Sequence, residues 1–231
     1  MRYQPDALML FAAGYGKRMG ALTADCPKPL IRVGGKTLLD HALALADAVG
    51  VKRKVVNLHY LSDQIAAHLA ARSDIDLSVE LPDILETGGG LRQALPLLGP
   101  GPVFTLNTDA VWTGHNPLET LHAAWQPDQM DALLVLVRTH AAPGYHGTGD
   151  FDLSPDGRII RGRNLVYVGA QILRTQGLYQ IPERIFSLNL FWDRIIADGR
   201  AFGVLHAGGW CDVGTPAGIA AAEAMLRDAD V

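Results

Sequence analysis

The chain has 231 residues, of which 48% are hydrophobic and 19% charged, and its formal net charge is −4. This composition is typical of a globular α/β protein with a substantial core and excludes a disordered chain. The slightly negative charge excludes a general basic field for nucleic acid, so any phosphate binding must come from local geometry.

Cysteine content and apolar runs indicate the cellular compartment of such a protein. Cys26 and Cys211 lie far apart and form no C-x-x-C pattern, which favours neither a disulfide framework nor a zinc site. No apolar run approaches the roughly 18 residues that a membrane-spanning helix needs. The first residues lead into a strand rather than a signal-peptide core. We therefore expect a reduced, cytoplasmic protein with no membrane or nucleic-acid partner.

The first predicted element is a buried strand over residues 7–11, followed by a turn that contains Gly14 and Gly16. Glycine allows positive φ and a close ligand approach, and such turns point several N–H groups toward one anion. The predicted cradle consists of Ala12, Ala13, Gly14 and Gly16, with Lys17, Arg18 and Lys28 beside it. We interpret it as a phosphate site for a nucleoside triphosphate; the alternative is an ordinary strand–turn with solvated basic residues.

Two better-known glycine motifs do not fit this turn. The dinucleotide-binding fingerprint requires Gly or Ala where this chain has Met19. A nucleotide-binding P-loop that ends at Gly35-Lys36-Thr37 would place its first glycine at Leu30. A dinucleotide-dependent oxidoreductase is therefore a weak alternative.

Strands and helices alternate along the first half of the chain. The pattern predicts a strand and turn over 31–36, a helix over 38–49 ended by Gly50, a strand over 54–58, a helix capped by Ser62, and a strand over 76–80. This alternation implies a mainly parallel sheet. We predict one α/β domain over residues 1–231, with a Rossmann-like, mostly parallel central sheet flanked by helices.

A run of three glycines, residues 88–90, follows Glu86 and Thr87 and precedes a predicted helix over 91–98. Consecutive glycines cost conformational entropy and therefore need a physical reason. One reason is a ligand lying against the backbone, and the other is a tight strand–helix connection.

The next predicted strand, residues 102–107, ends at Asn107 and is followed by Thr108 and Asp109. Ligands of open α/β sheets bind beyond the carboxyl ends of the strands, where Asp109 is placed like a magnesium ligand. The alternative is an Asx turn.

After an apolar strand over 130–137, the pattern changes over residues 138–170. Two short strands, 149–153 and 158–161, flank a turn and predict an antiparallel pair. We expect a small antiparallel, sugar-binding lid region inserted into the core. The rest predicts strands over 166–173 and 201–206, a helix beginning at Ser187 and a last helix over 216–227.

The glycine turn, together with Pro27-Lys28-Pro29-Leu30, resembles the signature of the sugar-1-phosphate nucleotidyltransferases. This chain has Phe11 for the usual Leu and Ala21 for the usual Pro. Two later segments, Thr87-Gly88-Gly89 and residues 210–216, also resemble the family. The resemblance implies a nucleotide-diphospho-sugar transferase-like fold and a reaction between a nucleoside triphosphate and a sugar 1-phosphate.

The resemblance also implies residue roles. It makes Arg18 and Lys28 catalytic cations and Asp109 and Asp212 catalytic ligands of Mg²⁺. The family holds the nucleotide base through the segment that contains Thr87 and Gly88. Candidate sugar-binding residues are Asn107, Asp150, Asn164 and Gly169.

Several local features resemble the N-acetylmuramic acid α-1-phosphate uridylyltransferases of cell-wall (peptidoglycan) recycling, which use UTP. They are the short length and the segments 56–61, 85–90 and 149–151. Arg161, Arg163 and Asn164 could then bind the lactyl carboxylate, or could form a solvated basic turn. Alternatives are a mannose-1-phosphate or heptose-1-phosphate guanylyltransferase and a non-catalytic nucleotide-sugar sensor. Oligomeric state is left open.

Overall fold

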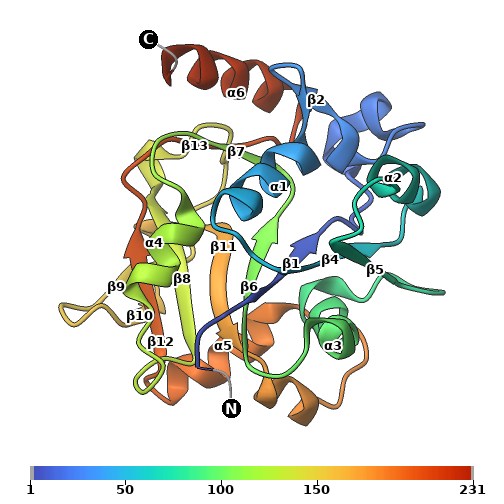
Figure 1. Cartoon of the computed structure of the whole chain (residues 1–231). Helices are drawn as coiled ribbons and strands as arrows, with labels where there is room; N and C mark the ends of the chain where they lie inside the picture. Colours follow the sequence, from blue (N-terminus) through green and yellow to red (C-terminus); the bar gives the residue numbers. More distant parts are fainter. Residues whose placement is uncertain (1–2, 230–231) are drawn as a thin grey trace.

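The computed structural model describes residues 3–229, so residues 1–2 and 230–231 of the predicted domain lie outside it (Figure 1). A nine-stranded sheet forms its centre. Its strands are β1 (Ala7–Phe11), β4 (Arg53–Leu58), β5 (Ile75–Val79), β6 (Pro102–Asn107), β8 (Ala132–Arg138), β9 (Phe151–Leu153), β10 (Ile159–Arg161), β11 (Leu165–Arg174) and β12 (Ala201–Leu205).

The sheet is mostly parallel along the strands β12-β8-β11-β6-β1-β4-β5, and β9 and β10 branch from it at β11. The pairs β12–β8, β6–β1, β1–β4 and β4–β5 are parallel, whereas β11 runs antiparallel to both β6 and β8. The β9–β10 hairpin joins this sheet where Phe151 pairs with Leu165. These pairings confirm the predicted fold class, with its antiparallel region on one side of the sheet.

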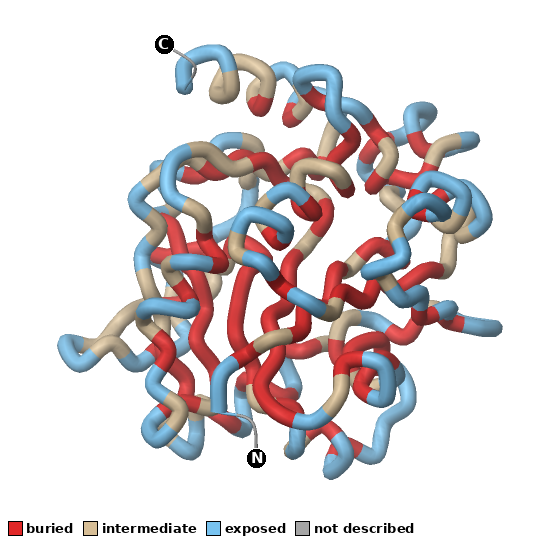
Figure 2. The backbone as a smooth tube through the Cα atoms, viewed as in Figure 1, coloured by how far each residue is buried: buried red, intermediate tan, exposed pale blue. Residues whose placement is uncertain are grey.

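Helices cover both faces because the buried strands carry apolar side chains on both sides. In β1, Leu8 and Leu10 pack with α1 (Leu38–Ala48), α2 (Ser62–Leu69) and α4 (Pro117–Ala124). Ala7 and Met9 of the same strand pack with α3 (Glu86–Leu98) and α5 (Leu188–Ala197). Figure 2 shows the central strands as the most continuously buried part of the chain.

A smaller layer lies beyond the main sheet. It consists of the pairs β2 (Arg32–Val33) with β3 (Lys36–Thr37) and β7 (Ala110–Trp112) with β13 (Trp210–Asp212), and of α6 (Pro216–Ala229). Val111, Cys211 and Val213 pack together with Ala222 of α6 and Met19 of the glycine turn. This packing brings a segment from the end of the chain to the carboxyl end of β6.

Three sequence predictions differ from the structure in their boundaries. The helix predicted over 91–98 begins at Glu86, so the glycine run lies within its first turns. Ser62 is the first residue of α2 and not its cap, because Leu61 holds that place with φ 49° and no side chain caps the helix. The lid boundary at 170 falls inside β11, which pairs with β6 and β8 and therefore belongs to the central sheet.

Candidate active site

A cleft of ≈ 290 Å³ opens at the carboxyl ends of β1, β4 and β6. Parallel strands end at one edge of the sheet, so the residues that follow them converge there. The cleft is lined by Phe11, Ala12, Ala13, Gly14, Lys28, Pro29, Asn57, Glu80, Ile84, Glu86, Thr87, Asn107, Thr108 and Asp109. Ala12, Ala13 and Gly14 of the predicted cradle therefore lie in one cavity with the residues after β6, whereas Gly16 is not part of its lining.

The two glycines of the turn have different structural roles. Gly16 has φ 64°, and a Cβ at this position would lie 3.0 Å from the Cβ of Lys28. Gly16 therefore allows the turn to approach the segment that carries Lys28. Gly14 is exposed at the cleft, and a Cβ added there would meet no atom within 4 Å. No other part of the protein therefore requires glycine at position 14, and its contact with a ligand stays a prediction.

Lys28 is held in the cleft by the chain on both sides of it. Pro27 and Pro29 flank it, and the side chain is almost completely buried. Its Nζ lies 2.8 Å from Oδ2 of Asp109, the residue two positions beyond β6. The arrangement places a fixed positive charge beside a carboxylate at the rim of the cradle.

The β7–β13 pair brings Asp109 and Asp212 together from distant parts of the chain. Asp212 pairs with Ala110, and the N–H of Val213 donates to the carbonyl of Asp109 over 2.9 Å. Burial raises the pKa of the Asp212 carboxyl, and the nearby charge of Asp109 raises it further. Lys28, Arg18 and His146 lower that pKa in part, and Nη1 of Arg18 lies 3.9 Å from Oδ2 of Asp212.

Two carboxylates at the same end of the β7–β13 pair suit a magnesium ion better than an all-protein metal cage would. Residues 3–229 contain no group of three or more His, Cys, Asp or Glu side chains arranged to hold a metal. Mg²⁺ is commonly bound through one or two carboxylates together with substrate phosphates. Burial and the charge of Asp109 raise the pKa of Asp212, so a cation bound beside it would favour its ionised form.

Thr87 and Gly88, the predicted base-binding residues, have different surroundings. Thr87 lines the cleft, and its Oγ1 accepts a hydrogen bond from the N–H of Leu188. Gly88 donates its N–H to the carbonyl of Phe186 over 2.9 Å, and a Cβ at Gly88 would overlap the Phe186 ring. Packing against Phe186 is thus a sufficient reason for glycine at 88, and its contact with a nucleotide stays a prediction.

The predicted sugar-binding residues divide into two groups. Gly169 has φ 87° and lies against Asn107, since a Cβ there would be 2.7 Å from the Cβ of Asn107. Asp150 accepts the N–H of Tyr167 over 3.0 Å, and Asn164 donates to Oδ1 of Asp152 over 2.7 Å. Asn107 and Gly169 therefore meet at the cleft, whereas Asp150 and Asn164 are engaged with other parts of the protein.

Sequence reasoning assigned no role to Asn57 or Glu80, although both line the cleft. Each lies at the carboxyl end of a parallel strand, β4 or β5, and that position is the signal that selected Asp109. Tyr145 was missed as well, because nothing in the sequence places its loop. Burial raises the pKa of Tyr145, and the carboxylates of Asp150 and Asp212 raise it further; its hydroxyl accepts a hydrogen bond from the N–H of Gly149 over 3.1 Å.

Comparison with known proteins gives concordant results. The sequence profile of the MobA-like NTP transferase domain matches residues 8–175. An N-acetylmuramate alpha-1-phosphate uridylyltransferase from Caulobacter vibrioides is 43% identical over 99% of this chain and 100% of its own length. A protein of the same description from Neisseria meningitidis is 34% identical over 94% of this chain and 96% of its own length.

The fold agrees with a solved structure as well. The crystal structure of HddC from Yersinia pseudotuberculosis superimposes with a TM-score of 0.78 and covers 95% of this chain and 99% of its own. At 20% sequence identity, this likeness shows a shared fold. Among residues 3–229, no helix combines the length and the apolar character needed to cross a membrane.

Proposed function

Because this chain belongs to the family of MobA-like NTP transferase domains, we propose that it transfers a nucleoside monophosphate from a nucleoside triphosphate to a sugar 1-phosphate. The observation that carries this proposal is the placement of Lys28 and Asp109 at the mouth of the glycine cradle, 2.8 Å apart. Asp212 and Arg18 stand beside them. A cradle for phosphates with paired cations and carboxylates suits a reaction between two polyanions.

The chemistry needs no general base. A phosphate oxygen of the sugar 1-phosphate, already ionised, forms a bond to the α-phosphorus of the triphosphate. The bond from that phosphorus to the bridging oxygen breaks, and pyrophosphate leaves with the electron pair. Lys28 and Arg18 would hold the anions in line and balance the charge on the leaving side.

We propose that Asp109 and Asp212 hold Mg²⁺ in this reaction. A bound Mg²⁺ would neutralise phosphate charge and fix the position of the triphosphate. The chain itself supplies the cradle, the two cations and the two carboxylates. The ion pair between Lys28 and Asp109 fixes one carboxylate before any ligand binds.

For the substrates, we propose UTP and N-acetylmuramic acid α-1-phosphate, giving UDP-N-acetylmuramic acid in the cytoplasm. This choice is supported by two relatives of that description, each covered over nearly its whole length. A guanylyltransferase that acts on mannose or heptose 1-phosphate is the second candidate, since a mannose-1-phosphate guanyltransferase from Aspergillus fumigatus is 28% identical over 90% of this chain and 60% of its own length. A non-catalytic sensor would not require both the cations and the carboxylates.

A matrix of five nucleoside triphosphates against several sugar 1-phosphates, read by pyrophosphate release with Mg²⁺, tests the proposal. We expect the largest kcat/KM with UTP and N-acetylmuramic acid α-1-phosphate. A preference for GTP with a mannose or heptose phosphate would favour the second candidate and leave the transfer mechanism intact. Nucleotide-sugar binding without pyrophosphate release from any pair would identify a sensor.

A further inference from the structure

Glu80, which follows β5, is a completely buried carboxylate at the floor of the cleft. Its Oε1 accepts a hydrogen bond from Nδ2 of Asn57 over 2.7 Å, and its Oε2 accepts one from the N–H of Leu85 over 2.6 Å. Hydrogen bonds to a buried charged group are among the strongest in proteins. Both oxygens of Glu80 are therefore committed to bonds with other parts of the chain.

These bonds reach two opposite walls of the cleft. Asn57 links Glu80 to the glycine turn, because its Oδ1 accepts a hydrogen bond from the N–H of Ala12 over 2.7 Å. Leu85 precedes α3, whose first residues, Glu86 and Thr87, line the other wall. One carboxylate thus fixes the distance between the glycine turn and the start of α3.

The main chain of Glu80 adds a second connection to the same turn. Its carbonyl accepts a hydrogen bond from Nδ1 of His59 over 2.9 Å. The other ring nitrogen of His59 lies 3.0 Å from the hydroxyl of Tyr15, which belongs to the glycine turn. The turn is therefore attached to the end of β5 through both Asn57 and His59.

The third glycine of the run is explained by this carboxylate. A Cβ at Gly90 would lie 2.5 Å from Oε1 of Glu80 and 3.0 Å from Nδ2 of Asn57. Real Cβ atoms do not approach polar side chains so closely. Glycine at 90 leaves the space that the Glu80–Asn57 pair occupies.

We propose that Glu80 is a positioning residue for the nucleotide: with Asn57, it holds the glycine turn and the start of α3 at the spacing that receives the triphosphate and its base. The inference rests on the proposed function. Loss of the Glu80 carboxylate should weaken binding of the nucleotide much more than binding of the sugar phosphate. The predicted sugar-binding residues Asn107 and Gly169 have no bond to Glu80 among the described residues.

An exchange of the two side chains tests the pair. Glu80→Gln leaves one acceptor oxygen for two donors, Nδ2 of Asn57 and the N–H of Leu85. Asn57→Asp places a second carboxylate beside that of Glu80. In the double variant, the carboxylate at position 57 would accept hydrogen bonds from the N–H of Ala12 and from the side-chain amide at position 80. The amide oxygen at position 80 would accept the N–H of Leu85. We expect each single variant to raise KM for UTP about tenfold or more and to change KM for the sugar phosphate much less. The double variant should recover most of the loss.

Controls separate positioning from folding. Glu119→Gln, at an exposed carboxylate on α4, should leave both KM values unchanged. Gly90→Ala displaces the side chains of Glu80 and Asn57 without removing either, and it should raise KM for UTP as the single variants do. If the single variants are too unstable to assay, the double variant and Gly90→Ala still decide the question.

The inference is overturned if the single variants retain the wild-type KM for UTP, if both KM values rise equally, or if the double variant is no better than the worse single one. Failure of the proposed function is a separate result, since it would appear as no pyrophosphate release by the wild-type protein. In that case, binding of a fluorescent UTP analogue to the same variants tests Glu80 alone. Unchanged affinity in Glu80→Gln and Asn57→Asp would then overturn its role.

Discussion

The two halves of the cleft are built differently. The nucleotide half is held by buried side chains, such as Glu80 and Asn57, whose hydrogen bonds are internal to the protein. The half that we propose for the sugar adjoins the loop over residues 143–150, which ends at the predicted sugar-binding residue Asp150 and is exposed or half-buried throughout. Buried hydrogen-bonded groups are costly to change, whereas exposed loops tolerate substitution. The difference suggests that the phosphate chemistry is fixed and that sugar choice can vary at little cost in stability.

Asp109 and Asp212 stand where the two halves meet. Asp109 follows β6 and contacts Lys28 of the nucleotide half. The N–H of Asp212 donates to the carbonyl of Pro143, at the start of the exposed loop. Substitutions in each half should therefore have separable effects, while substitutions at this junction should stop the reaction.

The largest effect is expected for Asp212→Asn. We expect kcat to fall on the order of 1,000-fold, because a charge that positions the phosphates is lost. Stability should not fall and should rise near neutral pH, since the raised pKa of Asp212 means that its ionised form is disfavoured in the folded state. That gain should shrink as the pH falls through the raised pKa, where the wild-type carboxyl becomes protonated.

Thermal unfolding with and without Mg²⁺ provides a measurement independent of activity. The wild-type protein should gain Tm on addition of Mg²⁺, and Asp212→Asn should gain much less. Near-normal turnover of Asp212→Asn or of Asp109→Ala at limiting Mg²⁺ would remove the two carboxylates from the proposed metal site.

Lys28→Ala tests the nucleotide side of the junction. We expect kcat/KM to fall on the order of 100-fold with folding retained, as for the loss of a preorganised charge. Lys17→Ala is the matched control, because Lys17 lies in the same turn but is exposed above the ring of Tyr15. If kcat/KM of Lys28→Ala were as high as that of Lys17→Ala and of the wild type, Lys28 would not contact the reacting phosphates.

The sequence was sufficient for most strands of the central sheet and for the residues at strand ends, but it predicted neither α4 nor the β7–β13 pair. Strand alternation gave the parallel sheet, and position after β6 placed Asp109 correctly in the cleft. The need for the glycine run was harder to predict, because side chains distant in sequence occupy the space beside it. They are Phe186 at Gly88 and Glu80 at Gly90. Spacing within a segment does not reveal which distant residue will pack against it.

Contacts in the sugar-facing half were the least predictable. Tyr145 belongs to a loop without periodicity, so no sequence pattern predicted that its hydroxyl would accept the N–H of Gly149. Asp150 and Asn164 were expected at the sugar, yet both have partners within the protein. Their contact with a sugar stays a prediction, and polar residues in such loops can serve local structure and ligand alike.

Gly88→Val asks whether the first glycine of the run serves the nucleotide or the fold. A Cβ there would overlap the Phe186 ring and lie 2.9 Å from its carbonyl oxygen. We expect stability to fall by about 1–3 kcal/mol from overpacking, with KM for both substrates raised severalfold together. Gly14→Ala is the control for stability, since its Cβ would meet no protein atom within 4 Å and Tm should stay unchanged. Selective loss of nucleotide affinity at unchanged Tm would instead assign Gly88 to the base pocket.

The smallest effects, and the sharpest test of the sugar-facing half, come from two neighbouring arginines. Arg161 of β10 donates from Nε and Nη2 to Oδ1 of Asp193 on α5, over 2.9 and 2.6 Å, and its guanidinium lies 4.8 Å from the ring of Phe151. This side chain is committed to an exposed ion pair. Arg161→Ala should cost about 0.2–1 kcal/mol of stability and leave sugar selectivity unchanged.

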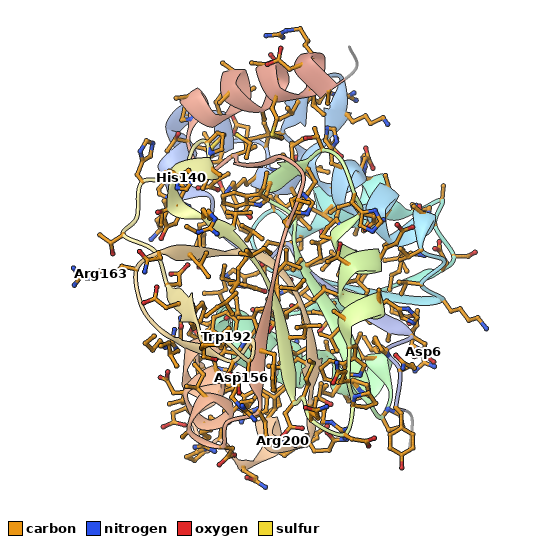
Figure 3. The ribbon with its side chains drawn as sticks, turned by 90° about the vertical axis from the view of Figure 1, so that its left-hand side faces the viewer. Asp6, His140, Asp156, Arg163, Trp192 and Arg200 are labelled. Carbon is orange, nitrogen blue, oxygen red and sulfur yellow. The ribbon has the colours of Figure 1, made fainter. Side chains whose placement is uncertain are left out.

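Arg163 differs in having no hydrogen-bond or ion-pair partner for its guanidinium within residues 3–229, and Figure 3 shows it pointing away from the ribbon. Its carbonyl lies beside Gly149, next to Asp150. A free guanidinium can form paired hydrogen bonds with a carboxylate. If it binds the lactyl carboxylate, Arg163→Ala should lower the kcat/KM ratio of N-acetylmuramic acid over N-acetylglucosamine 1-phosphate about three- to tenfold. An unchanged ratio in Arg163→Ala, or a drop in Arg161→Ala alone, would contradict this assignment.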